Sequence, residues 1–327
     1  MSLPVVREPL PSRSPDLCSP AAVAVARASP TPAEVSCEPE RAVFSSGASL
    51  APRTPVWFWF HLLSLDAPLV ACLWAAVFAR AFRATLAPAE LVSLGVAVWL
   101  IYVSDRLLDG YAFSGGALRE RHRFVAHHRV ALLAALAGLA TASTALVVPR
   151  LAAPTVRSGV SLLIVVGIYF LCVHRNVNFV WRFLPKELAV GLLFAAGTAL
   201  PVAMYRRSPL LILSVLLFAS LCTLNCVAIE SWESSHTTSH ASAASFAKWA
   251  GHRFFFLSAA FVFSCGAAAL SVPDARVRLF LAALAAGGIL LAALDRQKRR
   301  VTPRAQRVLA DVALVIPAVL FLLVFAR

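Results

Sequence analysis

The chain has 327 residues, of which 60% are hydrophobic and 14% are charged, and its formal net charge is +14. Because soluble domains carry about 25% charged residues, this composition excludes an ordinary soluble protein. The basic residues stand between apolar runs, where they set membrane orientation and meet anionic lipid or an anionic substrate. The positive charge therefore does not indicate nucleic-acid binding.

Residues 1–55 differ in composition from the rest of the chain. They are rich in Pro, Ser and Ala and show no sustained hydrophobic period. Segments of this kind bury too little apolar surface to fold, so we predict a disordered N-terminal tail. The remaining residues, 56–327, are predicted to form one transmembrane domain.

About nine apolar segments follow the tail at regular intervals. Most of them approach the ~20 residues that an α-helix needs to cross a bilayer. They predict an all-α, polytopic membrane protein with about nine transmembrane helices. The helices are expected near residues 57–80, 86–104, 130–149, 159–174, 187–205, 209–229, 254–271, 277–294 and 308–326.

The Lys and Arg residues are divided unevenly between the two predicted sides of the membrane. Most of them follow the even-numbered segments, and the loop after the eighth segment is the richest. Since cytoplasmic loops carry the excess of basic residues, we predict that the tail and these loops are cytoplasmic. The expected location is the cell inner membrane.

The second apolar segment ends in two aspartates, Asp105 and Asp109. Their i, i+4 spacing places both carboxylates on one helix face, where like charges repel and a cation is favoured. Mg²⁺ prefers oxygen ligands and keeps coordination positions for substrate phosphates, so the pair suits this ion. The alternative is that Arg106 and neighbouring arginines neutralise the pair at the membrane surface.

The sixth apolar segment ends in a similar way, with Glu230 and Glu233 at i, i+3 spacing and Asn225 about one turn deeper. An amide inside a helical bundle usually makes a specific hydrogen bond. Taken alone, the pair also fits an interfacial helix end anchored by Trp232. Because both acidic pairs end helices on the same predicted side, they are arranged like the two halves of a metal–diphosphate clamp.

Other polar residues near these helix ends are candidates for the same region. Asp66 lies inside the first segment, where an aspartate either marks a functional site or pairs with an arginine. Five histidines fit interfacial positions better than a transition-metal site, namely His122, His127, His128, His236 and His240. Arginine and lysine are the usual partners of a diphosphate, although each candidate also fits plain positive-inside topology. The basic candidates are Arg121, Arg123 and Lys186.

Two stretches resemble the UbiA superfamily of membrane prenyltransferases. Residues 105–110 (DRLLDG) resemble the second half of that family's first aspartate-rich motif, and residues 65–69 (LDAPL) resemble its entry to helix one. The chain has Ile101 and Tyr102 where the first motif has Asn and Asp. The glutamate pair stands in place of the family's second motif, which has a DxxxD form.

The resemblance implies a UbiA-like bundle of nine helices around a central cavity, and an Mg²⁺-dependent reaction. The reaction would transfer a prenyl group from an allylic prenyl diphosphate to a lipophilic acceptor of aromatic or quinone type. On this interpretation the catalytic and Mg²⁺-binding residues are Asp105, Asp109, Glu230 and Glu233. The diphosphate is bound by Arg121, Arg123, Lys186 and Asn225. An allylic cation is stabilised by aromatic faces such as those of Tyr102, Tyr169 or Phe124.

Three other functions remain open. An inactive relative would bind an isoprenoid, a quinone or another lipid without chemistry. A His-ligated membrane metal oxidase would use His236 and His240 as metal ligands. A transporter would require an internal repeat and polar residues at mid-membrane depth, whereas the polar residues here lie near the helix ends.

Overall fold

The computed structural model describes residues 60–61, 63–112, 127–175, 184–234 and 245–325. The chain divides into Met1–Ala51 and Pro52–Arg327, and all described residues belong to the second unit. This described part consists of helices and turns and contains no strand, which confirms the all-α prediction for it. The predicted tail, 1–55, lies outside the described residues.

Eight of the described helices are long and apolar enough to cross a membrane, judged by their length and composition. They confirm the prediction of a polytopic helical membrane protein. The eight are α3 (Pro88–Ala112), α5 (Arg129–Leu146), α6 (Ala153–His174), α8 (Lys186–Tyr205), α9 (Pro209–Ser234), α11 (Phe254–Ser271), α12 (Ala275–Gln297) and α13 (Pro303–Val324). The helix α6 begins earlier than the predicted residue 159, because Pro154 favours a helix's first turn.

The first predicted segment, 57–80, corresponds to α2 (Asp66–Ala81), which has 16 residues. The helix begins at Asp66 because a turn precedes it, in which Ser64 has a positive φ of 58°. Pro68 stands in the first turn of α2, where its missing N–H costs no intrahelical hydrogen bond. At 16 residues, α2 is about 24 Å long, so the count of nine spanning helices stays a prediction.

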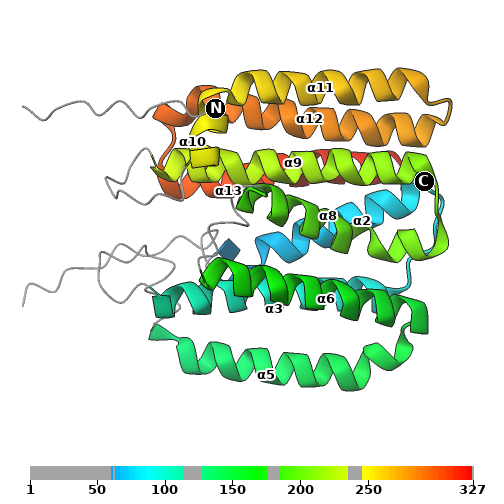
Figure 1. The fold of residues 1–327 in the computed structure, drawn as a ribbon. Helices are drawn as coiled ribbons and strands as arrows, with labels where there is room; N and C mark the ends of the chain where they lie inside the picture. Colours follow the sequence, from blue (N-terminus) through cyan, green and yellow to red (C-terminus); the bar gives the residue numbers. More distant parts are fainter. Residues whose placement is uncertain (1–59, 62, 113–126, 176–183, 235–244, 326–327) are drawn as a thin grey trace, which may run out of the picture. The chain divides into compact units, whose positions relative to one another are not determined.

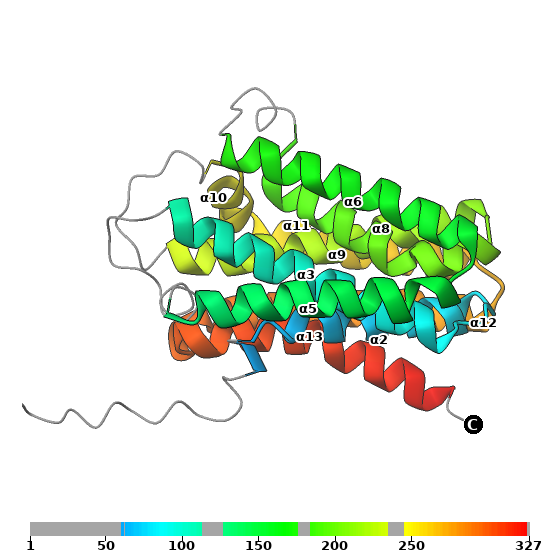
Figure 2. The same cartoon turned by 90° about the horizontal axis from the view of Figure 1, so that it is seen from below.

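The long helices lie side by side and cross the bundle in alternating directions (Figures 1 and 2). Helices α2, α5, α8, α11 and α13 begin at one end, called the His61 end, where α3, α6, α9 and α12 finish. The short helix α10 (Ser245–His252) lies at this end as well. The opposite end, called the Arg83 end, contains the turn between α2 and α3.

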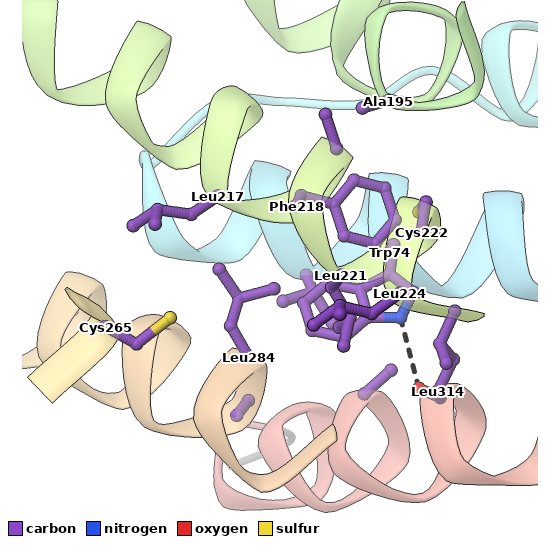
Figure 3. Close-up of a cluster of buried hydrophobic side chains, with 14 of the residues drawn as sticks. Trp74, Ala195, Leu217, Phe218, Leu221, Cys222, Leu224, Cys265, Leu284 and Leu314 are labelled. Atoms are coloured by element: carbon purple, nitrogen blue, oxygen red, sulfur yellow. Dashed lines mark hydrogen bonds between the residues drawn. The ribbon is translucent and has the colours of Figure 1, made fainter. Parts of the chain in front are cut away.

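The helix α2 lies at the centre of the described bundle and carries its main aromatic cluster. Trp74 and Phe78 are fully buried, and each has a ring centroid 4.8 Å from a partner, Phe218 and Phe280 respectively. The indole Nε1 of Trp74 also donates to the carbonyl oxygen of Leu314 on α13 over 3.1 Å (Figure 3). Since lipid is as apolar as these side chains, close packing and the buried hydrogen bond hold α2 in place.

Candidate functional site

A polar cluster lies at the His61 end, between the start of α2 and the third turn of α13. The Nδ1 atom of His61 is 2.6 Å from Oδ2 of Asp66. One oxygen of Asp66, one oxygen of Asp311 and one ring nitrogen of His61 all lie within 4.8 Å of one another. Asn225 of α9 donates from Nδ2 to Oδ1 of Asp311 over 3.3 Å, and Arg106 of α3 donates to the His61 carbonyl over 3.0 Å.

Local sequence explains how Asp66 and Asp311 come to these positions. Asp66 is the first residue of α2, where a negative charge interacts favourably with the helix dipole, and its Oδ1 accepts from the N–H of Ala67. Asp311 lies about 9 Å along α13 from Ala305, the first residue of the spanning stretch. An ionisable group at this depth in a bilayer is costly unless it is partnered, and here the partners are Asp66, His61 and Asn225.

The predicted acidic pair of α3 lies within one helical turn of Arg106, the residue of α3 that contacts the polar cluster. Tyr102, Arg106 and Asp109 follow one another at helical spacing, and Asp105 lies beside Arg106. Arg106 is buried and reaches the backbone of His61, so this face of α3 points toward the start of α2. Asp105 is half-buried, whereas the side chain of Asp109 lies outside the described side chains.

The predicted acidic pair of α9 contacts two basic side chains from other helices. Glu230 Oε1 is 3.8 Å from the Nζ of Lys186 at the start of α8. Glu233 is buried and forms an ion pair with Arg307 of α13. Within the described side chains, neither glutamate belongs to a group of three or more side chains that could hold a metal. The convergence of four carboxylates, which would require Asp109, stays a prediction.

Several predicted residues fall in segments that the structure does not describe: Arg121, His122, Arg123, Phe124, His236 and His240. Their assigned roles stay predictions. His127 and His128 are described; they are exposed at the start of α5, with ring centroids 4.8 Å apart. Asn225 donates its described hydrogen bond to a carboxyl group of the protein, and its predicted role in diphosphate binding stays a prediction.

A large apolar cavity of about 410 Å³ lies between α3, α5, α6 and α8. It extends from Glu90, near the Arg83 end, to Tyr102, which is about 18 Å further along α3. Its walls include the aromatic side chains of Tyr169, Phe170 and Phe194. Buried Glu90 is its one acidic lining residue among those described, and it accepts a hydrogen bond from Tyr205 over 3.1 Å. The volume falls in the usual range for small-molecule sites.

Tyr102 connects this cavity with the polar cluster. It lines the cavity, and it is close enough to both Asp66 and Asp311 to interact with them electrostatically. A second cavity of about 160 Å³ is lined by His61, Asp66 and Asp311 themselves. An amphiphile with its tail between α3, α6 and α8 would therefore present its head near a group of carboxyl, amide and guanidinium side chains.

Sequence reasoning identified Asp66 but missed His61 and Asp311 as parts of a site. Asp311 carried a detectable signal, because it is an acidic residue inside the last apolar segment, the same criterion that selected Asp66. No such signal marked His61, since a single histidine before a helix is common. No family model, curated protein or solved structure matches this chain.

Proposed function

We propose that the chain transfers a prenyl group from an allylic prenyl diphosphate to a lipophilic acceptor of aromatic or quinone type, with Mg²⁺ as cofactor. The observation that carries the proposal is the apolar cavity of about 410 Å³, which ends at Tyr102, close to Asp105 on the same helix. A prenyl chain fits an elongated apolar cavity, and a diphosphate requires cations at the polar end. We further propose that the fold is UbiA-like and that the His61 end faces the cytoplasm of the inner membrane.

The side chains available for Mg²⁺ suit that ion in part. Mg²⁺ prefers oxygen ligands, and Asp105 and Asp109 supply carboxylate oxygens at i, i+4 spacing. These two residues are proposed to hold the ion. Glu230 is 30% exposed, so it can exchange its contact with Lys186 for a ligand. Glu233 is less suited to the ion, because Arg307 already pairs with it. Bound Mg²⁺ would neutralise charge on the leaving diphosphate.

The protein's own side chains meet the remaining requirements of the reaction. Lys186 supplies a partly exposed ammonium group beside Glu230, where it can bind the departing diphosphate. The apolar walls exclude water, which would otherwise capture an allylic cation. The ring of Tyr102 lies where the cavity meets the polar cluster, and an aromatic face stabilises a nearby cation. The carbon–oxygen bond to diphosphate breaks, a bond to the acceptor forms, and the acceptor loses a proton.

The test uses the purified full-length chain in lipid nanodiscs with radiolabelled prenyl diphosphates, Mg²⁺ and quinone-type acceptors. We expect labelled product from the natural protein and a loss of at least about 100-fold in turnover for Asp105→Asn and for Asp109→Asn. Arg150→Gln, a change at the Arg83 end, serves as the control and should keep full turnover. Full activity in both aspartate variants would refute the proposal.

A second function, lipid binding without chemistry, is favoured by one observation. Both glutamates of α9 contact basic side chains of the protein itself, which is the arrangement expected where no metal needs them. This alternative predicts that a labelled isoprenoid binds in the cavity without product formation. It also predicts that binding survives the loss of Asp105 and Asp109. The transferase proposal predicts instead that binding of the prenyl diphosphate is lost in those variants.

A further inference from the structure

We propose that His61, Asp66 and Asp311 form a binding site for one divalent transition-metal ion, separate from the Mg²⁺ site proposed at Asp105 and Asp109. Within the described residues, these three make the one group of three or more side chains whose ligand atoms lie close enough to hold an ion. The ligands come from α13 and from the start of α2 and the turn before it. A bound ion would therefore join two helices from opposite ends of the described chain.

The electrostatics of the cluster favour a cation. Its side chains are mostly buried, at 7% exposure for His61 and 13% for Asp66, and the oxygens of Asp66 and Asp311 lie within 4.8 Å of each other. Two carboxyl groups this close cannot both stay ionised unless a cation neutralises them; otherwise one of them takes up a proton. Burial in an apolar bundle increases that cost, because solvent does not screen the repulsion.

The donor set indicates which ion is preferred. One imidazole nitrogen and two carboxylate oxygens suit zinc, iron or manganese, whereas Mg²⁺ avoids nitrogen ligands. Metal–ligand bonds of about 2.1 Å place neighbouring ligand atoms about 3–3.5 Å apart. His61 Nδ1 and Asp66 Oδ2 are 2.6 Å apart in a hydrogen bond, so a bound metal ion would replace the proton between them and move the two atoms slightly apart. The other ligand atoms of the set lie within 4.8 Å of one another, so they would approach further when an ion binds.

Surrounding groups orient the ligands as they do in known metal sites. Asn225 holds Asp311 through Nδ2, and Arg106 holds the backbone of His61. The Oδ1 atom of Asn225 is buried and accepts no hydrogen bond from any described residue. The adjoining cavity of about 160 Å³ is lined by all three proposed ligands and has room for a water molecule on the metal.

The test measures metal binding directly, without using prenyl transfer. Purified full-length protein in nanodiscs is titrated with Co²⁺, followed by its visible absorption, and with Zn²⁺, followed by elemental analysis. We expect one ion per chain with a Zn²⁺-competable Co²⁺ spectrum. Asp311→Asn and His61→Gln should weaken binding by more than about 100-fold, and Asn225→Ala by about 10–100-fold.

Controls separate this site from the proposed Mg²⁺ site and from misfolding. Asp105→Asn should keep the Co²⁺ spectrum, and Zn²⁺ should raise the melting temperature of the natural protein but not that of Asp311→Asn. Asp311→Asn keeps a side chain that can bond Asn225, so its fold is expected to persist without metal. Binding unaffected by Asp311→Asn, loss of the spectrum in Asp105→Asn, or absence of stoichiometric binding would each overturn the proposal. None of these outcomes depends on prenyl-transfer activity.

Discussion

Trp74 donates a hydrogen bond from its indole nitrogen to the carbonyl oxygen of Leu314, and the two residues are 240 positions apart in the sequence. The contact joins α2 to α13 inside the cluster of buried hydrophobic side chains drawn in Figure 3. It fixes the position of α2 against α13, and these helices also carry Asp66 and Asp311. The geometry of the polar cluster therefore depends on packing deeper in the bundle.

The first prediction concerns this contact. Trp74→Phe removes a buried hydrogen bond and part of a fully buried ring, so we expect it to destabilise the protein by about 1–3 kcal/mol. Trp249→Phe is the matched control, because Trp249 is 48% exposed, and we expect a change below about 0.5 kcal/mol. Unfolding in SDS–detergent mixtures measures both. Equal effects would show that the Trp74 contact contributes little.

The second prediction concerns the close approach of α8 and α9. A Cβ atom at Gly191 would lie 2.7 Å from the carbonyl oxygen of Ala219 and would also meet the Thr223 side chain. Because backbone cannot move aside cheaply, we expect Gly191→Ala to destabilise the protein by about 1–3 kcal/mol. The start of α8 carries Lys186 and the end of α9 carries Glu230, so the change should also disturb their contact.

Gly138→Ala on α5 is the control for this substitution. A Cβ atom there meets nothing within 4 Å, and alanine favours a helix over glycine by up to about 1 kcal/mol. We therefore expect Gly138→Ala to be neutral or stabilising in the same unfolding assay. Equal loss of stability in both variants would contradict the proposed tight contact between α8 and α9.

Much of the fold could be predicted from the sequence, because an apolar run of about 20 residues has few alternatives to a spanning helix. Eight of the expected helices are present, with ends that differ from the predicted ones by up to eight residues. The start of α2 could not be predicted in this way. Apolar residues continue on both sides of Ser64, whereas the turn there depends on a positive φ that the sequence does not signal.

The third prediction compares two ion pairs at the His61 end. In the Glu233–Arg307 pair the side chains are 8% and 18% exposed, whereas Glu230 and Lys186 are 30% and 40% exposed. Removing one partner of a buried pair leaves the other charge buried and uncompensated, so Arg307→Gln should destabilise the protein by about 3 kcal/mol. Lys186→Gln should cost less than about 1 kcal/mol, because solvent screens the more exposed pair.

A double variant completes this comparison. Glu233→Gln combined with Arg307→Gln removes both charges, so it should recover most of the stability lost in Arg307→Gln alone. The measurement is again equilibrium unfolding in SDS–detergent mixtures. Additive losses in the double variant would mean that Glu233 and Arg307 do not stabilise each other.

The candidate site was only partly accessible from the sequence. Spacing along one helix indicates which residues share a face, and it identified Asp105 with Asp109 and Glu230 with Glu233. Spacing gives no information about which helices are neighbours, so the contact of Asp66 with Asp311 and the ion pair of Glu233 with Arg307 were not foreseen. Both depend on α13 packing against α2 and α9.

The last prediction tests whether the large cavity holds the prenyl chain. Gly159 lines the cavity, and a Cβ atom at this position meets nothing within 4 Å, so Gly159→Phe would add a ring at the cavity wall. We expect binding of a labelled prenyl diphosphate to weaken by at least about 10-fold, because the ring fills space in which part of the prenyl chain would otherwise be buried. Gly138→Phe adds the same ring to α5 away from the cavity lining and should leave binding unchanged. Comparable binding in the two variants, with both proteins stably folded, would place the prenyl chain elsewhere.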